Sequence, residues 1–304
     1  MLQQLLSATI NGLTSGATLF LVAVGLSLIF GVLRVLNVAH GSFYAIGAFM
    51  AAVVWTLLRA AGLPSYLIYP GLFVVAVVVG IVVGPVVERF LLHWSFSVEP
   101  LSRREVVQLL ATFAVFLILE DGQKLVFGTQ PYYSGGALGL LGASRIGGIL
   151  HTNYQLLLVP LAGIVLWLLR LFLSKTRSGR CLVAVAEDAE VSATMGVHVT
   201  RMQVLSFTLG AALAALGGAL ASPAIGVTIG IGADMVVLSF AVVATAGLGQ
   251  IEGAAVASVL IGVAHSLTVF FLPVLDTVSP YLIMLLVLMI RPMGLFGMQR
   301  QRSI

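Results

Sequence analysis

Polar side chains recur at helical spacing within the apolar N-terminal stretch. Asn11, Ser15 and Thr18 stand at positions i, i+4 and i+7, so they share one face of a helix. Amide and hydroxyl groups of this kind can hydrogen-bond a small polar solute or a neighbouring helix. Because polar groups in an apolar environment need partners, we expect this face to pack against protein or to line a water-filled path.

A second group of polar residues lies in the run RVLNVAHG, which contains Arg34, Asn37 and His40. A histidine can titrate near neutral pH or bind a metal. No second histidine or carboxylate stands at ligand spacing, so we expect no metal site. We expect Asn37 and His40 to bond backbone groups at a break between helices, with Gly41 allowing close approach. The alternative is direct contact between these side chains and a substrate.

The adjacent acids Glu120 and Asp121 fall within another apolar stretch. They could carry a proton, cap that stretch at an interface or contact a soluble partner. The sequence contains no G-x-x-x-x-G-K-[ST] run for nucleotide phosphates, and neither the H-x-x-x-H nor the G-x-S-x-G pattern. We therefore expect no enzyme activity and no bound cofactor, so the energy for any transport must come from another chain or from an ion gradient.

The stretch from Lys175 to Arg201 is far more polar than the rest of the chain. The run AVAEDAEVSATMGV predicts one short helix, with Glu187 and Asp188 in its first turn, where acids complement the helix dipole. Gly196 can adopt a positive φ and end that helix. Whereas only 9% of all residues are charged, seven are charged here: Lys175, Arg177, Arg180, Glu187, Asp188, Glu190 and Arg201.

Val191 and Met195 lie one turn apart on this predicted helix, among three acids. Helices that lie on a membrane surface usually carry Lys and Arg on their polar face. The pattern therefore favours docking into a groove of another protein, and the alternative is an amphipathic loop helix at the lipid headgroups. Thr200 and Gln203 have the spacing of a capping box, which predicts a stiff junction with the next helix.

The composition places the elements that hold these residues in a membrane. Hydrophobic residues make up 60% of the chain and the mean hydropathy is +1.13, whereas a soluble domain is about 45–50% apolar. We predict an all-α polytopic transmembrane helix bundle of about 8–10 spans, half helices included, forming one domain over residues 1–304. The Asn11, Ser15 and Thr18 face should then be shielded from lipid. The apolar segments are 3–31, 38–60, 66–91, 105–127, 153–173, 202–222, 233–249, 252–272 and 277–297.

The Lys and Arg distribution predicts the orientation, because cytoplasmic loops carry an excess of these residues. With the N-terminus outside and the C-terminus inside, the outer side receives only Arg59, Lys124 and Arg145. The net charge of +4 therefore indicates topology and not nucleic-acid binding. The inner side receives twelve: Arg34, Arg89, Arg103, Arg104, Arg170, Lys175, Arg177, Arg180, Arg201, Arg291, Arg300 and Arg302.

Several stretches resemble the permease subunits of bacterial ABC importers, and specifically the branched-chain (hydrophobic) amino-acid importer permeases. The charged stretch resembles their coupling segment, with Gly179-Arg180, Ala186-Glu187-Asp188, Ala193 and Gly196 in place. The block GLSLIFGVLRVLNVAHGSFYAIGAF is similar to the family's most recognisable block, as are AGLGQIEGA and the terminal RPMGLFG. The family usually has Tyr-Ala where Leu19 and Phe20 stand, so these two residues join the candidates for the translocation path.

The resemblance implies a transmembrane permease domain with a cytoplasmic coupling segment at 175–201, in the bacterial inner membrane. Its implied partners are two ATP-binding cassette subunits that hydrolyse ATP, a second related permease subunit, a periplasmic substrate-binding protein and membrane lipid. Implied coupling residues are Arg180, Glu187, Asp188, Glu190, Val191, Met195 and Gly196. The implied cargo is a branched-chain or related small amino acid. Alternatives are urea, short amides or another small organic solute on the same machinery, and a proton-coupled secondary transporter.

Overall fold

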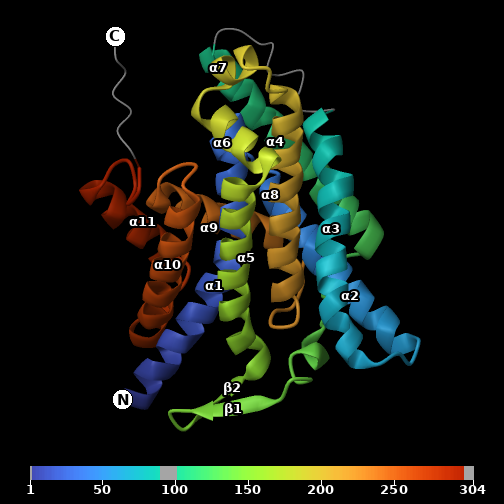
Figure 1. Cartoon of the computed structure of the whole chain (residues 1–304). Coiled ribbons are helices and arrows are strands. Elements are labelled where there is room, and N and C mark those ends of the chain that lie inside the picture. Colours follow the sequence, from blue (N-terminus) through green and yellow to red (C-terminus); the bar gives the residue numbers. More distant parts are fainter. Residues whose placement is uncertain (1, 90–100, 298–304) are drawn as a thin grey trace.

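A computed structural model describes residues 2–89 and 101–297, and within them the chain is a bundle of helices (Figure 1). All nine predicted apolar segments coincide with helices, so the predicted all-α fold is confirmed. The helices are α1 (Leu2–Leu33), α2 (His40–Ala60), α3 (Ile68–Val87), α4 (Leu101–Phe127), α5 (Asn153–Lys175), α6 (Arg177–Glu187), α7 (Ala189–Thr194), α8 (Val199–Ala221), α9 (Ile231–Ala246), α10 (Ile251–Phe271) and α11 (Ser279–Ile290).

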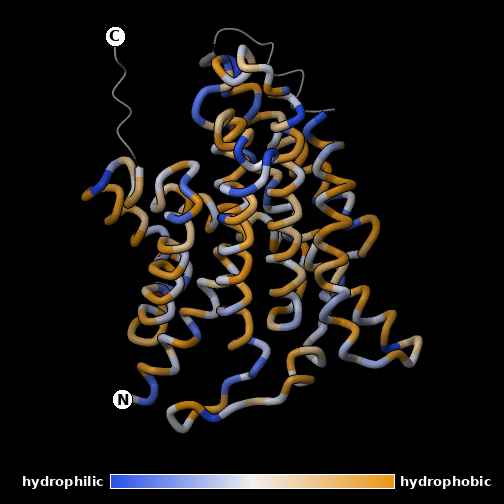
Figure 2. The backbone as a smooth tube through the Cα atoms, viewed as in Figure 1, coloured by the Kyte–Doolittle hydropathy of each residue, from blue (hydrophilic) through white to orange (hydrophobic). Residues whose placement is uncertain are grey.

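Length and composition make the bundle a multi-pass membrane protein. In the described part of the chain, α1, α2, α3, α5, α8 and α10 are long and apolar enough to cross a membrane, while α9 and α11 are apolar but shorter. Hydrophilic residues gather toward the two ends of the bundle (Figure 2). The N-terminus lies at one end, and α6 and α7 lie at the other (Figure 1). Arg300 and Arg302, which entered the orientation count, are outside the described residues.

Helices α1–α2–α3 and α8–α9–α10 pack in a similar order, and the two sets run in opposite directions. Helix α1 runs antiparallel to α8, as shown by the contacts of Gly25 with Gly210 and of Val22 with Gly217. Helix α10 packs along α1 much as α3 packs along α8, and these are among the most extensive helix contacts in the protein. The order α1–α2–α3 is therefore repeated, inverted, by α8–α9–α10, an arrangement common in transporters.

Helices α2 and α9 both begin inside the bundle. The Nε2 atom of His40, the first residue of α2, lies 2.9 Å from the carbonyl oxygen of Val22. Val22 lies eleven residues before the end of α1, about 16 Å along the helix axis. Gly41 packs against Gly232 of α9, where an added Cβ would lie 2.6 Å from the Gly41 carbonyl oxygen. The prediction of 38–60 as an ordinary span missed this internal start.

The long connection between α4 and α5 is ordered at the N-terminal end of the bundle. It contains a short antiparallel hairpin, β1 (Ala143–Ile146) and β2 (Ile149–Thr152), which the sequence did not predict. The Ser134 hydroxyl donates a 2.9 Å hydrogen bond to the carbonyl of Ser222, just after α8. Backbone bonds between Tyr132 and Val227 join the same two segments. This connection therefore braces the chain as it re-enters the bundle toward α9.

Candidate functional site

The charged stretch begins with a tight turn that fixes α6 against α5. The Thr176 hydroxyl accepts a 2.9 Å hydrogen bond from the Gly179 backbone N–H and donates a 2.7 Å bond to the Phe172 carbonyl. Gly179 faces the α5 backbone, where an added Cβ would lie 2.6 Å from the Leu173 Cα. Glycine is thus required here for close packing, which explains the glycine of the Gly179-Arg180 pair in physical terms.

Two short helices form the segment, where the sequence predicted one. Helix α6 buries Leu182 and Val185 in the core beside α1 and α8 and ends at Glu187. Asp188 has an extended backbone, and its Oδ1 accepts hydrogen bonds of 3.0 Å from the N–H groups of Glu190 and Val191. Asp188 is therefore the N-cap of α7, and the placement of Glu187 and Asp188 in one first turn was wrong.

Helix α7 and the residue that follows it expose the apolar pair that the sequence analysis singled out. The exposed fractions of Val191 and Met195 are 58% and 80%. Arg180, Glu187, Asp188 and Glu190 are also exposed. Gly196 has a φ of +84°, so its predicted role in ending the helix is confirmed. The predicted capping box is wrong, because α8 begins at Val199 and its N-cap makes no side-chain cap bond.

One charged residue connects this segment to the re-entrant chain between α1 and α2. Arg34 has a φ of +58°, the sole positive value for a non-glycine among the described residues. Its Nη2 donates a 2.9 Å hydrogen bond to the carbonyl of Ala186, near the end of α6. A cation is favourable at this helix terminus. The sequence reasoning missed this contact, although Arg34 is the only charged residue before Arg59.

The re-entrant segment ends in a buried polar site. His40 is fully buried and bonds the Val22 backbone, as predicted for a helix break. Asn37 is fully buried too, but its side chain has no hydrogen-bond partner within the described residues, so the predicted backbone bond is wrong.

The polar face of α1 opens away from the hydrophobic core. Asn11 and Ser15 are exposed and Thr18 is half-buried, with its hydroxyl bonded to the Ser15 carbonyl at 2.8 Å. Ser15, Thr18 and Leu19 line a cavity of about 540 Å³. Phe20, 3% exposed, instead packs in the core. Shielding of Asn11 from lipid stays a prediction, and it requires a further chain.

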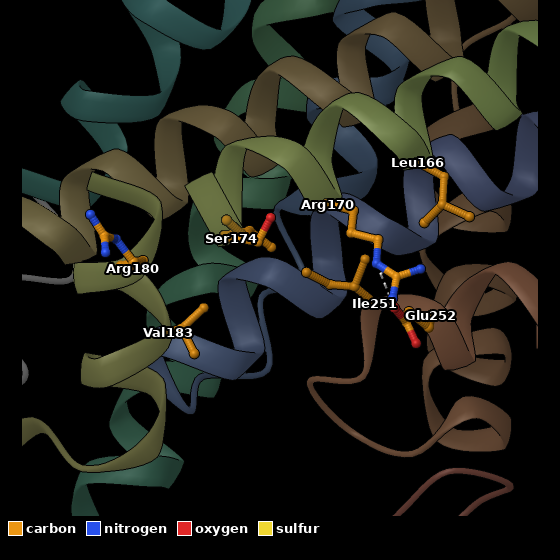
Figure 3. Close-up of a pocket in the computed structure, with 8 residues that line it drawn as sticks. Leu166, Arg170, Ser174, Arg180, Val183, Ile251 and Glu252 are labelled. Atoms are coloured by element: carbon orange, nitrogen blue, oxygen red, sulfur yellow. Dashed lines mark ion pairs between the residues drawn. The ribbon is translucent and has the colours of Figure 1, made fainter. Parts of the chain in front are cut away.

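A second, largely apolar groove lies beside the coupling segment (Figure 3). Its volume is about 410 Å³, and α5, α6 and α10 form its walls. Arg170 and Glu252 pair across it with 3.4 Å between Nε and Oε1. Both side chains are well exposed, so this pair contributes only about 0–1 kcal/mol. The groove adjoins Arg180 and Val183, so the exposed surface of α6 continues to α10.

The acids of α4 do not form an isolated proton site. The Lys124 ammonium lies 3.3 Å from a Glu120 carboxylate oxygen and 2.9 Å from that of Asp121. All three residues belong to one helix, and Asp121 is strongly exposed. Both carboxylates are thus paired with a lysine of their own helix. This arrangement does not favour a proton-coupled transporter.

A multi-pass helical bundle with an ordered, charged helix pair at one end has the architecture of the membrane subunit of an ATP-driven transporter. The comparison with known proteins agrees. The chain belongs to the branched-chain amino acid transport system / permease component family, whose model matches residues 8–290.

Relatives match over nearly the whole chain. The high-affinity branched-chain amino acid transport system permease protein BraD of Pseudomonas aeruginosa is 32% identical, covering 97% of this chain and 95% of BraD. The corresponding LivH protein of Salmonella typhimurium is 28% identical over 94% of each chain. The probable LivH permease of Methanocaldococcus jannaschii is 30% identical over 92% of this chain and 88% of its own.

Proposed function

We propose that this chain is one of two related permease subunits that carry a branched-chain or related small amino acid across the bacterial inner membrane. Separate cytoplasmic ATPase subunits hydrolyse ATP, and this chain binds no nucleotide or other cofactor. A periplasmic binding protein delivers the substrate. The names of the relatives support the substrate class. The exposed Asn11 and Ser15 face supports a second membrane subunit, because polar groups are costly against lipid.

The observation that carries the proposal is the exposed apolar pair formed by Val191 of α7 and Met195, the residue that follows α7. Val191 and Met195 protrude at one end of the bundle, on and directly after a helix whose orientation is fixed by the Asp188 cap. Their flanking acids disfavour an anionic lipid surface. An ATPase groove lined by basic and apolar groups would match them, and methionine adapts well to such grooves. With this end in the cytoplasm, the N-terminus and the hairpin face the periplasm.

The hydrogen bond from Arg34 to Ala186 connects the surface at which the ATPase would dock to the interior of the bundle. A displacement of α6 moves the Ala186 carbonyl, and Arg34 carries that displacement to the re-entrant segment. That segment leads within six residues to His40 and the start of α2. Movement at the surface therefore reaches a buried polar site about 16 Å inside the bundle.

Substitution of the apolar pair tests the proposal directly. The double variant Val191→Asp, Met195→Asp should lose copurifying ATPase subunits and substrate-stimulated ATP hydrolysis. Burial of each side chain contributes at most about 1.5–3 kcal/mol. Val274→Asp is the matched control, because Val274 is 93% exposed, in the turn after α10. If the double variant retains both properties, α7 is not the docking element.

Transport assays distinguish the proposed function from a secondary transporter and from an importer of another solute. Uptake by the chain alone in vesicles, driven only by a proton gradient, would show a secondary transporter. Uptake of urea or short amides, with no uptake of leucine, isoleucine or valine, would show a different cargo on the same machinery. Both assays use the complete complex with its binding protein as the reference.

A further inference from the structure

The cavity beside α1 is lined by residues that belong neither to the coupling segment nor to the re-entrant segment between α1 and α2. Besides Ser15 and Thr18, its polar lining includes Asp234 at the start of α9, His265 of α10, Asp276 and Thr277 before α11, and Tyr281 of α11. The rest of the lining is apolar and includes Leu19, Leu238 and Ile261. Its volume of about 540 Å³ lies within the range of small-molecule sites.

A hydrogen-bonded histidine lies against one carboxylate at the edge of the cavity. The His265 ring is fixed between two groups, with Nδ1 2.7 Å from the Ser279 hydroxyl and Nε2 3.3 Å from Asp276 Oδ1. The Ser279 hydroxyl donates to the Asp276 backbone carbonyl at 3.2 Å. The Asp276 side chain nonetheless stays 63% exposed. The histidine thus orients this carboxylate while leaving part of it open to a ligand.

The second carboxylate has no cationic partner. Asp234 lies in the first turn of α9, and no Lys or Arg of residues 2–89 and 101–297 pairs with it. Among the described residues, no Lys or Arg lines the cavity. The cavity therefore offers two carboxylates and several hydroxyls, and of the two carboxylates only that of Asp276 lies against a histidine.

The position of the cavity fits an entry site. His265 lies fourteen residues beyond the start of α10, about 21 Å from the end that carries the coupling segment. It lies only six residues from Phe271 at the opposite end. The cavity is therefore closer to the end at which the proposed function places the binding protein.

We propose that this cavity is the outer subsite of the permease and binds the ammonium group of the amino acid. Asp234 and Asp276 accept its N–H groups, and His265 positions Asp276. Leu19, Leu238 and Ile261 receive the aliphatic side chain, while the Ser15 and Thr18 hydroxyls face the polar part of the substrate. This inference rests on the proposed function and adds to it the groups that recognise the substrate.

Thiol protection tests the chemistry of the subsite without the binding protein. Ser15→Cys is made in a Cys181→Ala background in the purified complete complex, and maleimide labelling is timed. 3-Methylbutylamine, which has the leucine skeleton and an ammonium, should slow labelling. 4-Methylpentanoate has the same apolar chain but no ammonium, and should not. Adding Asp234→Asn with Asp276→Asn should abolish the protection. Equal protection by both compounds, or by neither, overturns the proposal.

Transport by the same variants separates this inference from the proposed function. With saturating liganded binding protein, Asp234→Asn with Asp276→Asn should lower the uptake rate about tenfold, as loss of charge-assisted bonds predicts. The half-saturating concentration of binding protein should not change. Glu252→Gln, at the opposite end of α10, is the matched control and should transport normally. Unchanged uptake in the Asp variants would refute the proposed subsite and leave the proposed function standing. A wild-type complex without ATP-dependent uptake of these amino acids would sink the proposed function.

Discussion

Removal of the Arg34 side chain should uncouple ATP hydrolysis from transport, and two substitutions separate coupling from stability. Arg34→Ala removes the 2.9 Å bond to Ala186 but keeps a side chain at a φ of +58°. Because the bond is exposed, its loss should cost about 1 kcal/mol of stability. Arg34→Gly loses the same bond, but it also relieves about 1–2 kcal/mol of left-handed backbone strain.

The two variants should therefore differ in thermal stability and agree in coupling. Glycine also gains about 0.5–1 kcal/mol of freedom in the unfolded chain, so Arg34→Gly should be close to wild type in stability and Arg34→Ala slightly below it. Both should hydrolyse more ATP per substrate transported. The measurements are thermal inactivation of the complex and the ratio of ATP hydrolysed to substrate taken up in proteoliposomes. A stable Arg34→Gly complex with the wild-type ratio would refute transmission through this contact.

Other substitutions test the fold and its orientation. Gly41→Ala should impair folding severely, because the new Cβ would collide with the Gly232 carbonyl; normal yield and stability of the variant would contradict this contact. Gly196→Ala should cost about 1–2 kcal/mol, and Gly196→Val more, because the space is open and only the positive φ is unfavourable; thermal inactivation gives the order, and equal midpoints would argue against it. Ser144→Cys in a Cys181→Ala background should react with an impermeant thiol reagent added to the periplasmic side, and labelling from the cytoplasm alone would reverse the topology.

Hydropathy predicted the helices well because it reports composition along the chain. Hydropathy could not report how far inside the bundle a helix begins. The start of α2 inside the bundle depends on the approach of Gly41 to Gly232, two residues far apart in sequence. The break before α7 was ambiguous locally, because an aspartate suits both a first turn and an N-cap. Tertiary packing decided it, since Leu182 and Val185 hold α6 in the core and α7 turns away.

The residues of the candidate site could likewise be predicted only where spacing along a single helix revealed them. The exposure of Val191 and Met195 followed from their spacing among acids. Ser15 and Thr18 were found from periodicity on one helix. Asp234 and Asp276 were not, because they are far from α1 in sequence and only the folding of α9, α10 and α11 around it brings them to one cavity.

The glycine contacts of the two inverted halves have a mechanical consequence. Gly25 faces Gly210 with reciprocal backbone approaches of 2.6 and 2.8 Å for an added Cβ, and Gly41 faces Gly232 in the same reciprocal way. Reciprocal contacts of this kind lie on the axis that relates the halves, and points on an axis stay fixed during rotation. The glycines would thus serve as a fulcrum in the middle of the membrane. When the halves turn about a central fulcrum, separation at one end accompanies approach at the other, so backbone packing alone would couple the two ends of the bundle in opposite senses.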